Sequence, residues 1–135
     1  MPDAISTRPL LDKLGVRPGA RVGVIGLDEP WFEALLSERA VDLTLGRAEP
    51  ASDLIFLGAD STADLEPLAA LRDLITPAGG IWVVSRKGRE ATVRDVEVIG
   101  AALDARLVDN KVVAFSETRT ALRLVIRRVD RPSAR

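Results

Sequence analysis

The sequence predicts an α/β fold, a three-layer Rossmann-like arrangement with a mostly parallel sheet and a C-terminal antiparallel hairpin. The runs 53–58 and 81–85 are apolar on both faces, as central strands of a parallel sheet are, because helices cover both sides. A helical pattern separates these runs and makes a strand–helix–strand unit. The two last strand-like segments, 106–115 and 120–129, are joined by the short loop 116–119 and therefore predict a hairpin.

The first elements are a short helix and a buried strand. Ser6 or Thr7 can cap the helix, and Gly15 ends it in the left-handed conformation that favours glycine. The segment 21–26 is apolar on both faces and is predicted to be the first strand.

The next predicted helix begins near Pro30, with Asp28 or Glu29 as its cap. Four apolar residues at helical spacing should face the sheet: Trp31, Phe32, Leu35 and Leu36. The segment 41–45 alternates apolar and polar residues, as an edge strand does.

In the second half, 60–64 is predicted to be a capped turn. A helix then runs from about Glu66 to Pro77, where two glycines turn the chain into the strand ending at Ser85. A capping box of Thr92 and Asp95 is predicted to open the next helix. Its core face is predicted to consist of Val96, Ile99 and Leu103, and Trp82, like Trp31, is expected to serve packing.

Length and composition indicate one soluble globular domain, residues 1–129, followed by a polar tail, 130–135. The 135 residues are 47% apolar and 29% charged. No apolar run reaches the roughly 18 residues of a membrane span. The N-terminus has neither the basic nor the apolar region of a secretory signal. A cytoplasmic location is therefore expected.

The missing residue types restrict the chemistry. The chain has no cysteine, histidine or tyrosine, which excludes disulfides, thiolate nucleophiles and histidine bases. Its net charge of −1 supplies no general attraction for nucleic acid, so no nucleic-acid partner is expected. No metal or cofactor is predicted from the residue pattern.

Three segments resemble the class I, S-adenosylmethionine-dependent methyltransferase fold. Residues 14–22 resemble the approach to that family's first strand, 53–57 its fourth strand, and 75–83 the Leu-x-Pro-Gly-Gly step into its fifth strand. The likeness covers nearly the whole chain and implies the methyltransferase fold.

The cofactor features of that family differ here. Val24 stands where the family has an acid, and only Gly26 remains of its glycine-rich loop. Asp28 and Glu29, at a helix N-terminus, would repel the cofactor's carboxylate. The second strand ends at 43–46 without the acid that holds the ribose, and the family's third strand is missing.

The chain also resembles an uncharacterised bacterial family of small Rossmann-like proteins, for which the likeness implies a fold and no function. The matching residues are Lys87, Arg94, Asp95, Val108, Asp109, Asn110, Lys111 and Glu117. Arg119 stands where that family has an aromatic residue.

The first candidate site lies beyond the carboxyl ends of the strands, where open α/β sheets bind ligands. Its residues are Gly26, Asp28, Asp60, Ser85, Arg86 and Lys87. Arg86, Lys87 and Arg89 would hold a small anion, assisted by the helix N-terminus at Thr92. Alternatively, Asp28 and Asp60 are helix caps and the basic segment is a solvated loop.

The second candidate is a polar cluster of Arg94, Asp95, Asp109, Asn110, Lys111 and Glu117. Asp109, Asn110 and Lys111 interrupt an apolar strand, so they need solvent or partners. Three explanations remain open: a bulge or edge position, a buried Asp–Lys or Asp–Arg pair with Arg94 or Lys87 as candidate partners, and a functional site.

The leading hypothesis is a non-catalytic binding or regulatory module whose partner is an unknown protein or a small anionic ligand. A divergent methyltransferase is the alternative, although its small size leaves little chain for a substrate pocket. A third possibility is an enzyme that uses Asp28, Asp60 and Lys87 with a carboxylate-bound metal.

A homodimer through the edge 41–45 is a separate expectation. The basic face of the last strand, with Arg123 and Arg127, is expected to be solvated or to lie in a subunit contact.

Overall fold

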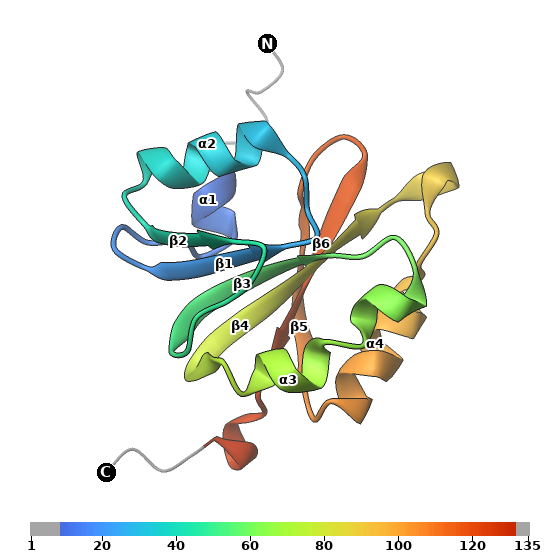
Figure 1. Cartoon of the computed structure of the whole chain (residues 1–135). Helices are drawn as coiled ribbons and strands as arrows, with labels where there is room; N and C mark the ends of the chain where they lie inside the picture. Colours follow the sequence, from blue (N-terminus) through green and yellow to red (C-terminus); the bar gives the residue numbers. More distant parts are fainter. Residues whose placement is uncertain (1–8, 132–135) are drawn as a thin grey trace.

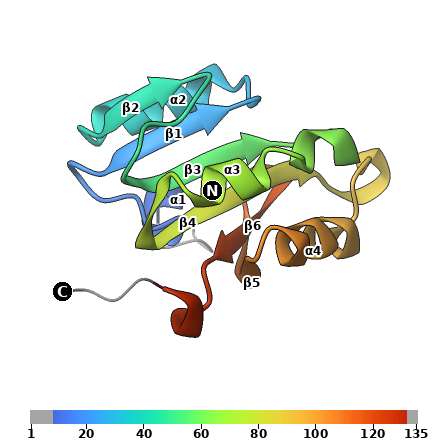
Figure 2. The same ribbon diagram turned by 60° about the horizontal axis from the view of Figure 1, so that its bottom comes forward.

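Six strands form one sheet in a computed structural model that describes residues 9–131 (Figure 1). The strands are β1 (Arg21–Ile25), β2 (Asp42–Leu45), β3 (Ser52–Gly58), β4 (Ile75–Arg86), β5 (Val108–Ala114) and β6 (Arg119–Val125). Their order is β2-β1-β3-β4-β6-β5, with β2 at one margin and β5 at the other (Figure 2). The four strands β2, β1, β3 and β4 are parallel, and β6 is antiparallel to both of its neighbours. This confirms the predicted fold class and its C-terminal hairpin.

Helices cover both faces of the sheet and make three layers (Figure 1). They are α1 (Leu10–Lys13), α2 (Pro30–Glu38), α3 (Leu68–Arg72) and α4 (Asp95–Asp104). Phe56 of β3 packs toward α1 and α2, whereas its neighbours Ile55 and Leu57 pack toward α3 and α4. This alternation explains why the central strands read as unbroken apolar runs. No helix among residues 9–131 is long and apolar enough to cross a membrane.

The segment before the buried part of β4 differs from the prediction. Helix α3 ends at Arg72, and β4 already begins at Ile75, so the predicted helix to Pro77 is wrong. Ile75 pairs with Ser52 and Gly80 with Leu54, so the residues 76–79 lie opposite a single residue of β3. Pro77 is tolerated in this irregular part of the strand because it need not donate to the ladder.

Helix α4 also differs from the prediction. It begins after Arg94, whose backbone N–H donates to Oε1 of Glu97 over 2.8 Å, so the predicted capping box at Thr92 and Asp95 is wrong. Val96 is 63% exposed and Leu103 is 59% exposed. The buried face is formed by Val98 and Ala102, and Ile99 is partly buried against the core as predicted.

The remaining differences between the predicted and the observed elements are smaller. The capping residues predicted for the first helix, Ser6 and Thr7, lie outside the described residues. The hairpin strands are shorter than predicted, and a 3₁₀ turn at Arg128–Asp130 follows β6. Trp82 is buried as expected. Trp31 also serves packing, since its ring lies 5.3 Å from that of Phe115, but it is 41% exposed and so lies at the rim of the core.

Candidate functional site

A chain of four alternating charges joins separate segments at the carboxyl ends of the parallel strands. Arg119, at the start of β6, donates from Nε to Oε2 of Glu29 over 2.9 Å, and its Nη1 lies 3.6 Å from Oδ1 of Asp60. The same Asp60 oxygen accepts from Nε of Arg86 at 3.3 Å. We call Glu29, Arg119, Asp60 and Arg86 the carboxyl-edge network. It connects the loops after β1 and β3 with the ends of β4 and β6.

The inner half of this network is shielded from solvent. The side chains of Arg119 and Glu29 are 15% and 23% exposed, whereas those of Asp60 and Arg86 are about half exposed. Trp31 Nε1 donates to the second carboxylate oxygen of Glu29 over 2.9 Å. Charge-assisted bonds of this kind are strongest where water is excluded, so Glu29 and Arg119 form the rigid part of the network.

Neither cap interpretation holds for the acids of the first candidate. Glu29 occupies the N-cap position of α2, but its carboxylate binds Arg119 and Trp31. The predicted turn after β3 is present at Thr62–Leu65, yet Ser61 caps it and Asp64 accepts from the backbone of Asp60. The side chain of Asp60 is therefore free to bind the two arginines of the network.

Asp28 faces a different space, a pocket of about 400 Å³ between the carboxyl ends of β1 and β2. Its polar walls are Asp28, from the loop after β1, and Glu33, from the first turns of α2. Gly26 and Gly46 form its floor at the ends of the two strands, and no basic side chain lines it. The charge of Glu29 is compensated by Arg119, so this pocket holds the two carboxylates of Asp28 and Glu33.

Gly26 and Gly58 allow the two central loops to lie against each other. Gly26 has a φ of +67°, a conformation that glycine adopts without strain. A Cβ added to Gly58 would lie 2.2 Å from the carbonyl oxygen of Gly26. The wall between the pocket and the network therefore depends on a glycine at position 58.

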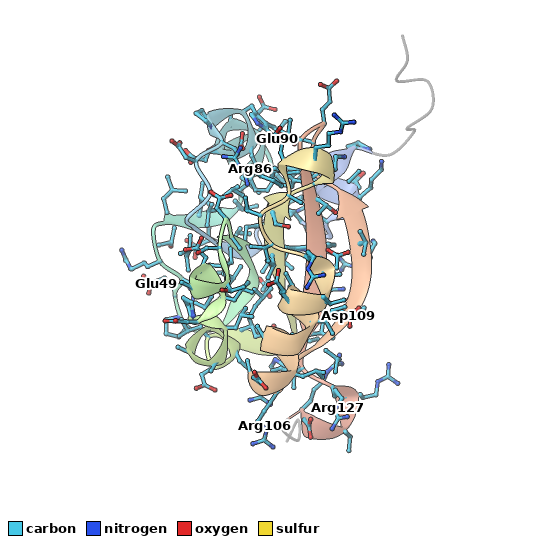
Figure 3. All side chains as sticks on the ribbon, turned by 90° about the vertical axis from the view of Figure 1, so that its right-hand side faces the viewer. Glu49, Arg86, Glu90, Arg106, Asp109 and Arg127 are labelled. Carbon is cyan, nitrogen blue, oxygen red and sulfur yellow. The ribbon has the colours of Figure 1, made fainter. Side chains whose placement is uncertain are left out.

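The remaining residues of the first candidate lie at the end of β4 and in the loop that follows it. Ser85 is buried in β4 opposite Thr120, and Lys87 is attached to the hairpin through its backbone N–H, which donates to Thr118 O over 3.0 Å. Arg86 is bound to Asp60, and Thr92 precedes the helix rather than starting it. Figure 3 shows Arg86 and Glu90 at one end of the molecule, with Arg106 and Arg127 at the other.

The second candidate is explained by its place in the sheet. Asp109 pairs with Leu124 and Lys111 with Arg123, so Asn110 is an extra, bulged residue on the edge strand β5. All three polar residues are exposed, which confirms the bulge and edge explanation and contradicts a buried pair.

Two members of this cluster, Lys111 and Arg94, have separate partners. The Nζ of Lys111 donates to the carbonyl of Lys13 over 2.9 Å, and the side chain of Arg94 lies 3.9 Å from that of Glu97. Asp95 is in the first turn of α4, and Glu117 is exposed in the hairpin loop. Within residues 9–131, no three acidic side chains come together in a way that could hold a metal ion.

Sequence reasoning missed three residues of the carboxyl edge. The sequence predicts a helix cap and a repulsive charge for Glu29, and it assigns no site to Glu33 or Arg119. A signal was present for Arg119, because an arginine replaces the aromatic residue expected from the resemblance. Its partner Glu29 lies ninety residues away in the chain, so the sequence does not reveal the pair.

Structural comparison identifies methyltransferases as similar folds. A TehB-like SAM-dependent methyltransferase from Corynebacterium glutamicum is 13% identical, with 92% of each chain covered and a TM-score of 0.64. A SAM-dependent methyltransferase from Aquifex aeolicus is 14% identical, with 87% of this chain and 88% of that chain covered and a TM-score of 0.64. A SAM-dependent O-methyltransferase from Thermotoga maritima is 12% identical, with 94% of this chain and 66% of that chain covered and a TM-score of 0.65.

No protein-family model matches the sequence, and no curated protein matches it. At these low identities the structural likeness concerns the fold alone. The described chain therefore has the fold of the class I SAM-dependent methyltransferases in a shortened form, in which β2 is the edge strand and a C-terminal hairpin completes the sheet.

Proposed function

We propose that the pocket at the carboxyl ends of β1 and β2 binds S-adenosylmethionine or a closely related nucleoside, and that the protein is a divergent methyltransferase. The observation that carries this proposal is the pair of carboxylates, Asp28 and Glu33, in a pocket without a basic side chain. Carboxylates accept hydrogen bonds from ribose hydroxyls and attract a sulfonium cation. The pocket also lies where open α/β sheets bind their ligands.

Two further observations support this proposal. The carboxylate of Glu29 is paired with Arg119, so only Asp28 of the two acids in this loop adds an uncompensated charge to the pocket. The match with the Corynebacterium methyltransferase covers 92% of both chains, so the two proteins have similar lengths. A protein named as a methyltransferase can therefore be as small as this one. The argument from small size against an enzyme is therefore weaker than the sequence alone indicates.

The second candidate function is a non-catalytic binding or regulatory module, and a specific observation favours it. The carboxyl-edge network places ion pairs of the protein's own side chains between the loops after β1 and β3. Those loops lie at the edge where open α/β sheets bind their ligands. A module of this kind could bind a nucleoside without any transfer.

Titration calorimetry with S-adenosylmethionine and S-adenosylhomocysteine tests the first proposal. We expect binding, and we expect Glu33→Gln to weaken it about tenfold, the effect of losing one hydrogen bond to a charged group. Glu38→Gln is the matched control, because Glu38 lies on the same helix and does not line the pocket.

The outcomes separate the two functions. Binding that Glu33→Gln weakens and Glu38→Gln does not supports the pocket as the nucleoside site. Consumption of S-adenosylmethionine in the presence of candidate acceptors then supports a methyltransferase, whereas binding without consumption supports the non-catalytic module. If neither nucleoside binds at millimolar concentration, the methyltransferase proposal is contradicted.

A further inference from the structure

A second pocket lies at the opposite, amino end of the parallel strands. It has a volume of about 610 Å³, within the range of small-molecule sites. Its walls are the turn before β1, the start of β3 and the irregular segment 76–79 of β4, and Arg123 of β6 reaches it from the side. We call it the amino-edge pocket. It shares no lining residue with the pocket around Asp28 and Glu33.

Arg123 enters this pocket across the backbone of β4. It pairs with Trp82 in the sheet, so both side chains are on the face that α1 covers. Gly80 lies two residues before Trp82, and a Cβ added there would be 2.7 Å from Nε of Arg123. The missing side chain of Gly80 therefore gives the arginine its path toward the pocket.

One nitrogen of the partly exposed Arg123 side chain, Nε, has no acceptor in the protein. This atom is fully buried, and Arg123 forms no ion pair with any residue in the range 9–131. Burial first, and the nearby charge of Arg131 second, lower the pKa of Arg123 from its ordinary value. Arg123 is thus partly exposed, which is less solvated than the neighbouring Arg127, although both were expected on a solvated face or in a subunit contact.

The surroundings add positive charge and a hydroxyl group. Arg17, in the turn before β1, is exposed and lines the same pocket, as does Thr76. The one acid on the wall, Asp53, accepts the backbone N–H of Arg21 at 2.9 Å through Oδ2. A buried guanidinium nitrogen without an acceptor is costly for a folded protein unless a ligand supplies one.

We propose that the amino-edge pocket binds a small molecule through a phosphate or carboxylate group, with Arg123 as its principal contact. The planar fork of the guanidinium fits either oxyanion with two parallel hydrogen bonds. Arg17 adds a second positive charge at the rim, and the hydroxyl of Thr76 can donate to a third oxygen. This site is independent of the nucleoside pocket at the other end of the sheet.

Thermal shift and calorimetry at constant ionic strength test the proposal, with inorganic phosphate and citrate as separate probes and chloride as the reference salt. We expect at least one probe to raise the melting temperature of the whole chain. If only phosphate raises the melting temperature, the natural ligand carries a phosphate group. If only citrate raises it, the ligand is a carboxylic acid. Arg123→Gln should weaken the binding about tenfold or more, because it removes charged hydrogen bonds.

Arg127→Gln is the matched control, since it removes the same charge near the end of β6 from an exposed residue paired with Asp130. Gly80→Ala is a second variant that keeps the charge and displaces the Arg123 side chain. We expect it to weaken binding as Arg123→Gln does. The proposal is overturned if no probe binds the original protein, or if Arg127→Gln weakens binding as much as Arg123→Gln does.

Discussion

Arg119 and Glu29 are ninety residues apart in the chain, and their side chains form a 2.9 Å ion pair at the carboxyl edge of the sheet. The pair ties the hairpin to the loop that follows β1. It also settles which of the two acids in that loop faces the pocket, because Glu29 turns toward Arg119 and Asp28 does not. The hairpin therefore helps to shape a pocket that lies on the far side of the loop.

Arg119→Gln should destabilise the protein, because it leaves the shielded carboxylate of Glu29 without its cation. A lost hydrogen bond to a charged group of this kind costs about 2 kcal/mol. We expect the melting temperature to fall by roughly 6 °C for a chain of this size. Arg89→Gln, in the exposed loop after β4, is the control and should have almost no effect. Equal melting temperatures for the two variants would contradict the importance of the pair.

The fold could be predicted because its signals are local. A strand covered on both faces is apolar throughout, and both β3 and the buried part of β4 show this in the sequence itself. The start of β4 could not be predicted in the same way. Residues 76–79 are strand only because Asp53 and its neighbours in β3 lie alongside them, and that pairing is not visible in a single segment.

The candidate site could also be predicted only in part. Asp60 and Arg86 were placed at one edge because strand order alone brings their loops together, and they do form an ion pair. Glu29 and Arg119 could not be paired from the sequence, because Glu29 also fits a helix cap and Arg119 lies in a distant hairpin. For Arg123, alternation along the strand predicts a solvated face or a subunit contact, but it does not show that the side chain lies over Gly80.

Trp82→Phe should loosen α1 from the sheet. The indole Nε1 donates to the carbonyl of Leu14 over 3.1 Å inside the core, and phenylalanine leaves that carbonyl without a partner. Such a buried acceptor costs about 1–3 kcal/mol. Because Leu14 leads into the turn that lines the amino-edge pocket, hydrogen exchange should accelerate in residues 15–20 more than in α4. Uniform acceleration in both segments would instead indicate a general loss of stability.

The outer edge of β2 predicts self-association. This strand ends the sheet, and Leu45 at its end is 51% exposed. Strand edges of this kind pair with a second chain unless charges or bulges protect them. We expect light scattering to show a dimer at high micromolar concentration and Leu45→Lys to shift it toward the monomer. Val96→Lys, which changes an exposed apolar residue of α4, should leave the dimer unchanged. A monomeric original protein would refute this prediction.

Two glycine substitutions should have opposite effects, because only one glycine is required by its neighbours. Gly58→Ala puts a Cβ 2.2 Å from the carbonyl oxygen of Gly26, which belongs to the backbone of the adjacent loop and cannot move aside cheaply. We expect a loss of about 3 kcal/mol or more, as for other strained or overpacked sites, together with weaker nucleoside binding. Gly100→Ala, in α4 with no atom within 4 Å of the new Cβ, should stabilise the protein by about 0.5–1 kcal/mol. Urea denaturation of both variants measures the difference, and a Gly58→Ala protein as stable as the original would show that the two loops are not held in contact.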